Sequence, residues 1–208
     1  MNWWSTQVVP RLTHRTLDNR LVRTYRKRVC AGLSGEVLEI GFGSGLNLPH
    51  LPAAVRSLAA VEPSDVAWSM AQGAISASPV TVRRAGGDAQ QLDLPDDSVD
   101  AALCTFTLCT VPDPVRALRE LHRVLRPGGT LHFLEHGLAP EAGVRRWQRR
   151  IEPAQRALAG GCHLTRSLPD LAGAAGFTVD VAESGYLPGP AVSRPWGYLS
   201  LGTASPVA

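Results

Sequence analysis

Short apolar runs alternate along the chain with longer stretches in which apolar residues recur at helical spacing. The apolar runs predict strands, and residues 98–107 are apolar almost throughout, as a strand buried on both faces should be. Strands that alternate with helices predict a parallel sheet, and right-handed crossovers make that sheet doubly wound. The predicted strands are 37–40, 58–61, 80–82, 98–107, 130–134, 177–182 and 196–201. The predicted helices are 5–31, 64–77, 114–125, 141–159 and 168–175.

Local signals mark several helix ends. Ser64 can cap the helix that follows the second strand, because its hydroxyl can accept a hydrogen bond from the first turn. The Pro-Gly-Gly run at 127–129 ends the helix at 114–125. The arginine-rich segment 5–31 is expected to form a long helix that is interrupted near Pro10.

The chain has 208 residues, of which 44% are hydrophobic and 19% are charged. This length favours one domain with a core large enough to need no disulfide bonds. The longest strongly apolar stretch, 101–111, is too short to span a bilayer, and Trp3 and Trp4 precede a polar segment rather than the apolar core of a signal peptide. We therefore expect a cytoplasmic protein. Its expected parts are a basic helical cap at 1–31 and one α/β domain at 32–208, with a helical insertion at about 138–170.

Charge is unevenly distributed, although the net charge is only +3. Residues 1–30 carry a net charge of +6 and residues 145–166 carry +5, whereas residues 31–144 carry −6. Solvated helix faces explain this pattern most simply, and contact with an anionic partner or a membrane surface is the alternative. Nucleic acid is disfavoured as a partner, since aromatic residues do not interleave with the basic ones.

A glycine-rich motif, EIGFGSG at 39–45, directly follows the first predicted strand. Its alternate glycines let the backbone turn tightly and approach a ligand closely. A dinucleotide fingerprint would have glycine where this chain has Leu46. Glu39 is poorly matched to a pyrophosphate and well matched to a cation or an ammonium group. The motif therefore disfavours a nicotinamide-dependent oxidoreductase.

Two further acidic residues follow the next two strands. Glu62 lies 21 positions after Gly41 at the end of the second strand, where a carboxylate can accept hydrogen bonds from both hydroxyls of a ribose. Asp88 follows the third strand, and its natural partner is the exocyclic amine of an adenine. Together these residues predict a site for an adenosine-containing ligand.

These residues resemble the class I S-adenosylmethionine-dependent methyltransferases over roughly residues 36–136. The resemblance implies a seven-stranded Rossmann-like sheet whose last strand is antiparallel, with an N-terminal helical cap. It also implies S-adenosylmethionine as cofactor and S-adenosylhomocysteine as product. The stretches that match the family are 37–45, 61–64, 87–94, 97–111 and 117–129. The cofactor-binding residues that the resemblance implies are Glu39, Gly41, Phe42, Gly43, Gly45, Asn47, Glu62, Pro63, Asp88, Ala89 and Thr105.

Three later segments indicate which branch of the family the chain resembles: 106–114, 133–137 and 160–166. They are similar to a branch that contains animal alkyl-thiol methyltransferases and bacterial relatives labelled as phospholipid or quinone methyltransferases. The animal enzymes begin with an apolar membrane anchor, where this chain has a basic amphipathic segment. The resemblance therefore implies a small-molecule acceptor and favours a thiol, methylated by in-line attack on the sulfonium methyl group.

A thiol acceptor needs orientation and modest help with deprotonation, because a free thiol has a pKa of about 8.5. His136 and His163 are the candidates to accept the proton, and Arg166 and Cys162 are the other residues assigned to the acceptor site. The remaining histidines are expected to be ordinary surface or core residues. They are His14, His50, His122 and His132.

Several alternatives stay open for the acceptor and the role. They are methylation of a quinone carbon, a phenol oxygen or a phospholipid amine, and a non-catalytic protein that binds the cofactor. A metalloid acceptor held by Cys104, Cys109 and Cys162 would require a turn between the first two, since they face opposite ways in an extended strand. The four cysteines include no closely spaced pair, so no metal site is predicted and buried small side chains are favoured.

Overall fold

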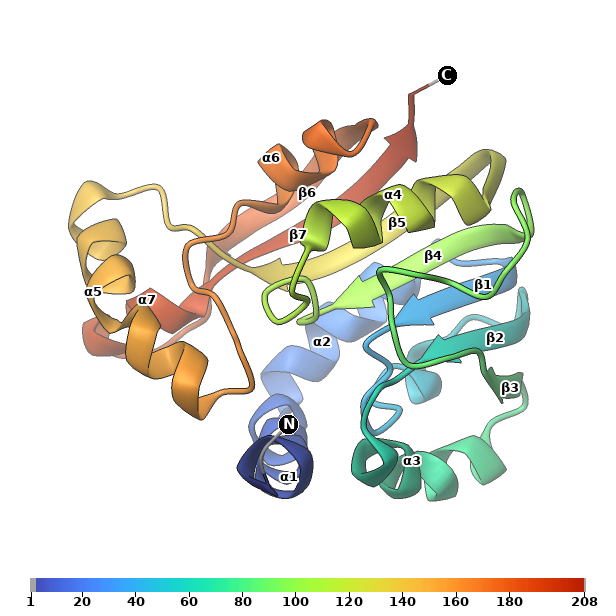
Figure 1. The fold of residues 1–208 in the computed structure, drawn as a ribbon, viewed down its shortest axis with the longest axis horizontal. Coiled ribbons are helices and arrows are strands. Elements are labelled where there is room, and N and C mark those ends of the chain that lie inside the picture. The colour runs from blue at the N-terminus through green and yellow to red at the C-terminus, as the bar shows by residue number, and fades with distance from the viewer. Residues whose placement is uncertain (1–2, 208) are drawn as a thin grey trace.

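The computed structural model describes residues 3–207, which form an α/β fold around a seven-stranded sheet with the order β3-β2-β1-β4-β5-β7-β6 (Figure 1). Neighbouring strands from β3 to β5 are parallel, whereas β7 is antiparallel to both β5 and β6. The predicted doubly wound sheet with an antiparallel last strand is confirmed. The strands are β1 (Gly35–Ile40), β2 (Val55–Val61), β3 (Thr81–Arg84), β4 (Val99–Thr105), β5 (Leu125–His136), β6 (Phe177–Tyr186) and β7 (Tyr198–Pro206).

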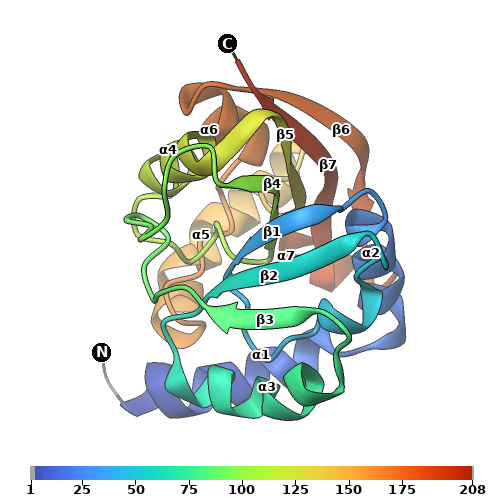
Figure 2. The same cartoon turned by 90° about the vertical axis from the view of Figure 1, so that its right-hand side faces the viewer.

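Helices cover both faces of the sheet and bury a separate apolar core on each (Figures 1 and 2). Leu118 and Leu121 of one helix and Ala172 of another bury one face, and Val29 and Ala71 contribute to the core of the other face. The helices are α1 (Val9–Leu17), α2 (Arg20–Cys30), α3 (Asp65–Ala77), α4 (Pro114–Val124), α5 (Ala142–Leu158), α6 (Leu168–Ala174) and α7 (Arg194–Gly197). Short helical turns lie at η1 (Trp4–Val8), η2 (Leu48–His50) and η3 (Ala191–Ser193).

Two predicted helix boundaries, at the start of α3 and near Pro10, can be compared with the structure. The hydroxyl of Ser64 accepts a hydrogen bond from Ala67 N at 3.2 Å and caps α3, as predicted. Near Pro10 the predicted interruption takes the form of a change of helix type, from the π-helical turn η1 to α1, which begins at Val9. A full break follows between α1 and α2, where the Asn19 side chain accepts a hydrogen bond from Val22 N at 3.0 Å.

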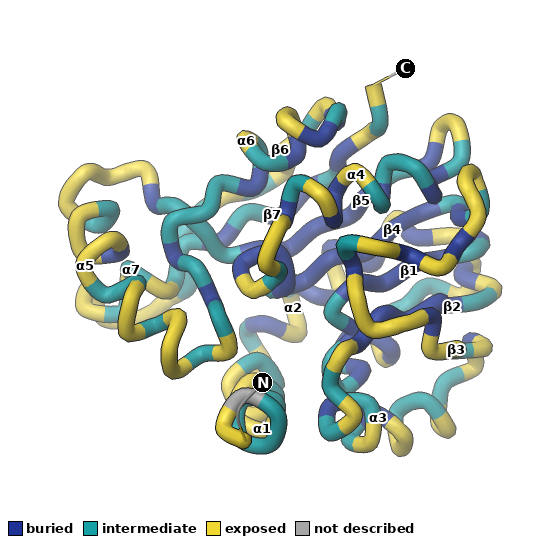
Figure 3. Tube along the Cα trace, viewed as in Figure 1, coloured by how far each residue is buried: buried dark blue, intermediate teal, exposed yellow. Residues whose placement is uncertain are grey.

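The carboxyl ends of β1 to β4 meet at one edge of the sheet, and α1 and α5 lie at that end of the molecule (Figure 1). The strands are largely buried, whereas the outer faces of α1 and α5 are exposed (Figure 3). In a doubly wound sheet this edge is where ligands bind. Between residues 3 and 207, none of the helices has both the length and the apolar character needed to cross a membrane.

Candidate active site

A cavity of about 750 Å³ opens at the carboxyl ends of β1 to β4. Its volume suits a ligand of the size of a nucleoside derivative. His14 of α1, expected to be an ordinary histidine, lines this cavity, and its Nδ1 lies 2.7 Å from the Ser44 hydroxyl. The lining residues are 41–44 and 46 of the glycine loop, 61–67, 87–90, 105–107 and 110–112, and, on the other side, residues from 6 to 17 and 159–160.

The glycine loop is held against the end of β2 by Glu62. This buried carboxylate accepts hydrogen bonds from Gly43 N at 2.6 Å and from Ser64 N at 2.7 Å. Burial raises the pKa of Glu62, and the two backbone hydrogen bonds act in the opposite direction. Gly41 has a φ of +67°, and a Cβ at this position would lie 2.0 Å from the Thr107 hydroxyl, so only glycine fits here.

Asp88 lies at the cavity wall beyond β3 with its carboxylate exposed to solvent. Its Oδ1 accepts hydrogen bonds from Gln90 N at 2.8 Å and from Gln90 Nε2 at 2.9 Å, and these bonds lower the pKa of Asp88. Ala89, Pro63 and Phe42 also line the cavity. The residues expected to surround a ribose and an adenine therefore share one wall.

Arg26 of α2 is a cavity residue that the sequence interpretation missed. Its Nη1 donates to Asn47 Oδ1 at 2.8 Å and to the Thr105 hydroxyl at 3.0 Å. Asn47 in turn donates to Glu39 Oε1 at 2.7 Å. A signal was available, because Arg26 lies four residues after Val22 and three before Val29, on the face of the helix that is buried.

The buried network of Arg26, Asn47 and Glu39 has polar atoms that are free to bind a charged ligand. Among the residues that the structure describes, Arg26 Nε and Glu39 Oε2 are buried without a hydrogen-bond partner. Burial raises the pKa of Glu39 to about 8, although the hydrogen bond from Asn47 opposes this shift. The cofactor implied by the resemblance has a carboxylate and an ammonium group at its methionine end. A buried cation and a buried acid, each with an unused polar atom, fit those two groups.

A second group of polar side chains lies behind the other end of the cavity. Cys162 Sγ is 3.2 Å from His136 Nε2, and the ligand atoms of Cys109, His136 and Cys162 all lie within 4.8 Å of one another. The contact with Cys109, together with the His136 imidazole, lowers the pKa of Cys162 against the effect of burial. Cys104 is not part of this group, since its thiol contacts Glu135 Oε1 at 3.0 Å. None of these side chains is among the described residues that line the cavity.

Arg166 ties the surrounding loops together rather than lying in the cavity. Its Nη1 donates to the carbonyls of Leu108, at 2.5 Å, and Val111, at 2.7 Å. Its own carbonyl accepts a hydrogen bond from Leu138 N at 2.9 Å. Arg166 therefore joins the end of β5 to the loop after β4.

His163 contacts α5 and does not line the cavity. Its Nδ1 lies 3.0 Å from Glu152 Oε1, and Glu152 Oε2 accepts hydrogen bonds from Leu164 N and Thr165 N. The structure thus brings Cys162 and His136 together and places His163 in a different contact.

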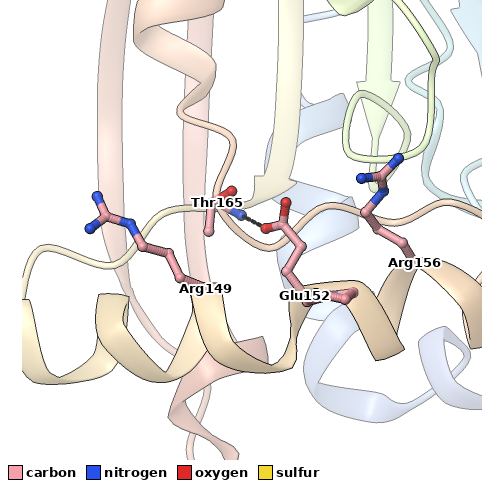
Figure 4. A pocket seen from close by; sticks show the side chains of 5 residues that line it. Arg149, Glu152, Arg156 and Thr165 are labelled. Carbon is pink, nitrogen blue, oxygen red and sulfur yellow. Dashed lines mark hydrogen bonds between the residues drawn. The ribbon is translucent and has the colours of Figure 1, made fainter.

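The carboxylate of Glu152 also lines a separate hollow of about 150 Å³ beside α5 (Figure 4). Arg149 and Arg156 of the same helix line this hollow too, together with Thr165. The cavity at the carboxyl ends of the strands shares none of these four residues, so the hollow is a distinct surface feature.

Comparisons with known proteins agree with this geometry. Residues 38–133 match a family model described as a methyltransferase domain. The rat thiol S-methyltransferase TMT1B is 36% identical over 143 residues, which cover 65% of this chain and 57% of the rat protein. The phosphatidylethanolamine N-methyltransferase of Cereibacter sphaeroides is 33% identical over 139 residues, which cover 61% of this chain and 66% of that protein. The chain thus spans less than two thirds of the length of either relative.

Solved structures show the same fold over nearly the whole chain. A methyltransferase from Thermotoga maritima superimposes with a TM-score of 0.69 at 24% identity, and the match covers 97% of this chain and 99% of that one. The sheet order, the glycine loop and the family match all agree. Residues 38–133 therefore form a methyltransferase domain with the class I fold, and S-adenosylmethionine is its cofactor.

Proposed function

We propose that this protein transfers a methyl group from S-adenosylmethionine to the sulfur of a small thiol. The rat relative is named a thiol S-methyltransferase, and this likeness supports a thiol over other acceptors. Both the methyl transfer and the choice of a thiol acceptor are proposals for this chain, because it matches only part of the rat protein.

One observation supports the choice of a thiol: among the described residues, the end of the cavity away from Glu62 and Asp88 has no acidic lining residue, and the one histidine of the lining, His14, has its Nδ1 engaged with the Ser44 hydroxyl at 2.7 Å. Its walls consist of apolar and hydroxyl-bearing residues. An amine or a carbon acceptor would need a base at this place, whereas a thiol with a pKa of about 8.5 ionises without one. The residues of this acceptor end are Val9, Pro10, Thr110, Val111, Pro112, Ala159 and Gly160.

At the other end, the chain's own residues hold the cofactor. Glu62 is placed to accept hydrogen bonds from ribose hydroxyls, and Asp88 and Ala89 to contact the adenine. Arg26 can bind the carboxylate of the cofactor's methionine end. Glu39, which is joined to Arg26 through Asn47, has an unpaired oxygen that can accept a hydrogen bond from the cofactor's ammonium group. When bound, the cofactor supplies an electrophilic methyl group on its sulfonium.

At the acceptor end, the protein orients the thiol and excludes water. Thr110 and Val111 line the cavity, and Arg166 fixes their loop by donating to the Val111 carbonyl. We assign Arg166 a positioning role on this basis.

The test is turnover by the purified chain with a panel of acceptors, measured as formation of S-adenosylhomocysteine. The panel contains hydrogen sulfide, short alkyl thiols, an aryl thiol, a catechol, a demethylated quinone and phosphatidylethanolamine in vesicles. We expect product with thiols, at a rate that rises with pH as the acceptor ionises. Product with the quinone, the catechol or the lipid alone would contradict the thiol assignment and leave the family unchanged.

A phospholipid amine is the second candidate, favoured by one surface feature. Trp3, Trp147 and Leu158 are exposed, and Trp4 Nε1 donates to the Leu158 carbonyl at 2.9 Å, so that η1 and the end of α5 meet. Exposed tryptophans beside arginines are suited to a membrane interface. Sedimentation of the protein with anionic vesicles, together with methylation of phosphatidylethanolamine, would favour this candidate over a small thiol.

A further inference from the structure

Two thiols and an imidazole meet at a single point behind the acceptor end of the cavity. Cys109 follows β4, His136 ends β5, and Cys162 follows α5, so three distant segments each contribute one side chain. Both cysteines are buried, with 3% and 7% of their surface exposed, and both are free thiols. Their sulfur atoms lie within 4.8 Å of each other, and Cys162 Sγ contacts His136 Nε2 at 3.2 Å.

The backbone holds these three segments in place. His163 N donates to the Cys109 carbonyl at 2.9 Å, which fixes the residue next to Cys162 against Cys109. Gly137, next to His136, lies so close to the Arg166 carbonyl that a Cβ would come within 2.4 Å of its oxygen. The three side chains are therefore brought together by the fold and not by a chance rotamer.

The spacing suits a tetrahedral metal ion. With zinc–sulfur bonds of about 2.3 Å and zinc–nitrogen bonds of about 2.0 Å, ligand atoms are separated by about 3.5 to 3.8 Å. The three ligand atoms here lie within 4.8 Å of one another, so small side-chain movements would place them around an ion.

The charges are compatible with such an ion. Two thiolates and a neutral imidazole around a divalent cation form a neutral group, which is less costly to bury than a lone thiolate. The Arg166 guanidinium lies near both sulfur atoms. Soft sulfur ligands select zinc over magnesium or calcium.

We propose that Cys109, His136 and Cys162 bind a thiophilic divalent metal ion of the zinc class, with one coordination position left for an outside ligand. The ion would cross-link the end of β5 to the loops after β4 and α5, and so fix the wall of the acceptor end. This inference goes beyond the proposed reaction and does not depend on it, because metal binding needs neither cofactor nor acceptor.

The experiment is a titration of the reduced, metal-free chain with Zn²⁺ in competition with a chromophoric chelator. We expect one ion per chain, no competition by Mg²⁺, and sulfur-to-metal charge-transfer absorption when Co²⁺ replaces Zn²⁺. Cys109→Ser, Cys162→Ser and His136→Gln should each weaken zinc binding at least about 100-fold, since each removes one of three ligands. Cys30→Ala is the matched control, a buried cysteine at the end of α2 that should leave the affinity unchanged.

Folding is checked by circular dichroism and by melting without metal, and His136→Gln keeps the test decisive if a cysteine variant does not fold. In the wild type, Zn²⁺ should also slow alkylation of Cys162 at least about tenfold, because the metal-bound thiolate is masked. Absence of stoichiometric binding by the folded, reduced chain would overturn the proposal, as would equal affinity in the ligand variants. Neither result would bear on thiol methylation, which the acceptor panel tests separately.

Discussion

The two ends of the cavity are built in different ways. At the cofactor end, Glu62 and Asp88 come from residues that follow strands, and the glycine loop follows β1 directly. At the acceptor end, the walls combine the loop after β4 with Ala159 and Gly160 after α5 and with residues near α1. The first arrangement depends on local chain geometry, and the second depends on how distant segments pack. We therefore expect substitutions at the two ends to separate cofactor binding from turnover.

The largest effect is expected at Glu62. Glu62→Ala removes the acceptor of two backbone hydrogen bonds and of the ribose hydroxyls, so the affinity for S-adenosylmethionine should fall at least about 100-fold. Isothermal titration calorimetry measures this change. Asp96→Asn is the control, since this exposed carboxylate pairs with Arg123 and does not line the cavity. Equal losses in both variants would contradict a specific role for Glu62.

A substitution of Arg26 tests which group of the cofactor this end of the cavity binds. Arg26→Met should weaken S-adenosylmethionine about 10- to 100-fold, because a charge-assisted contact to the carboxylate is lost. Binding of the decarboxylated cofactor analogue should change much less. The exposed neighbour Lys27 provides the control Lys27→Met. A similar loss for both ligands would show that Arg26 acts only on the structure of the site.

Arg166 tests the acceptor end. Arg166→Met should lower kcat about tenfold, because it removes the hydrogen bonds that hold the loop at 107–112. The affinity for the cofactor should stay within about threefold, since the contacts of Glu62 do not change. Arg166→Lys should recover part of the loss, and Arg156→Met, an exposed arginine of α5, is the control. A parallel loss of cofactor affinity would remove the distinction between the two ends.

The buried acid of the cofactor end predicts a pH dependence of stability. Burial raises the pKa of Glu39 to about 8, so the folded protein holds a proton that the unfolded chain has released above its ordinary pKa. Stability from this group is complete at low pH and is lost as pH rises toward 8, by up to about 4 kcal/mol between pH 5 and 8. The groups near Glu39 are Arg26, Glu62 and Cys30.

Urea unfolding of the wild type and of Glu39→Gln at pH 5 and pH 8 measures this dependence. The variant should lose less stability than the wild type over this interval. The same dependence in both proteins would contradict the assignment to Glu39.

The smallest effect is expected at His163. His163→Gln should leave kcat within about twofold, because the ring contacts Glu152 and not the cavity, and a partly exposed contact of this kind contributes only about 1 kcal/mol or less to stability. A fall in kcat of about 100-fold, the size expected for loss of a general base, would restore His163 as a catalytic residue. Glu152→Gln serves as the matched variant from the same pair.

The sequence predicted the sheet, the glycine loop and the positions of Glu62 and Asp88 beside it, because each follows from the local order of strand and turn. It did not predict that Arg26 lines the cavity, since this position depends on the packing of α2 against the carboxyl end of the sheet. Nor did spacing along the chain reveal the meeting of Cys109, His136 and Cys162, since rules for metal sites look for ligands that are close in sequence. His14 was treated as ordinary for the same reason, because only the fold brings α1 to Ser44.

The attachment of α1 has a consequence for the exchange of cofactor and product. Residues near and within this helix line the cavity, yet none of the residues Val9–Leu17 is buried. The contact of His14 with Ser44 joins the helix to the glycine loop, whereas the sheet beneath is held by a large apolar core. Local opening at such a segment requires far less free energy than global unfolding. We therefore expect α1 to detach from the glycine loop more readily than the sheet unfolds, which would open the cavity while the sheet stays intact.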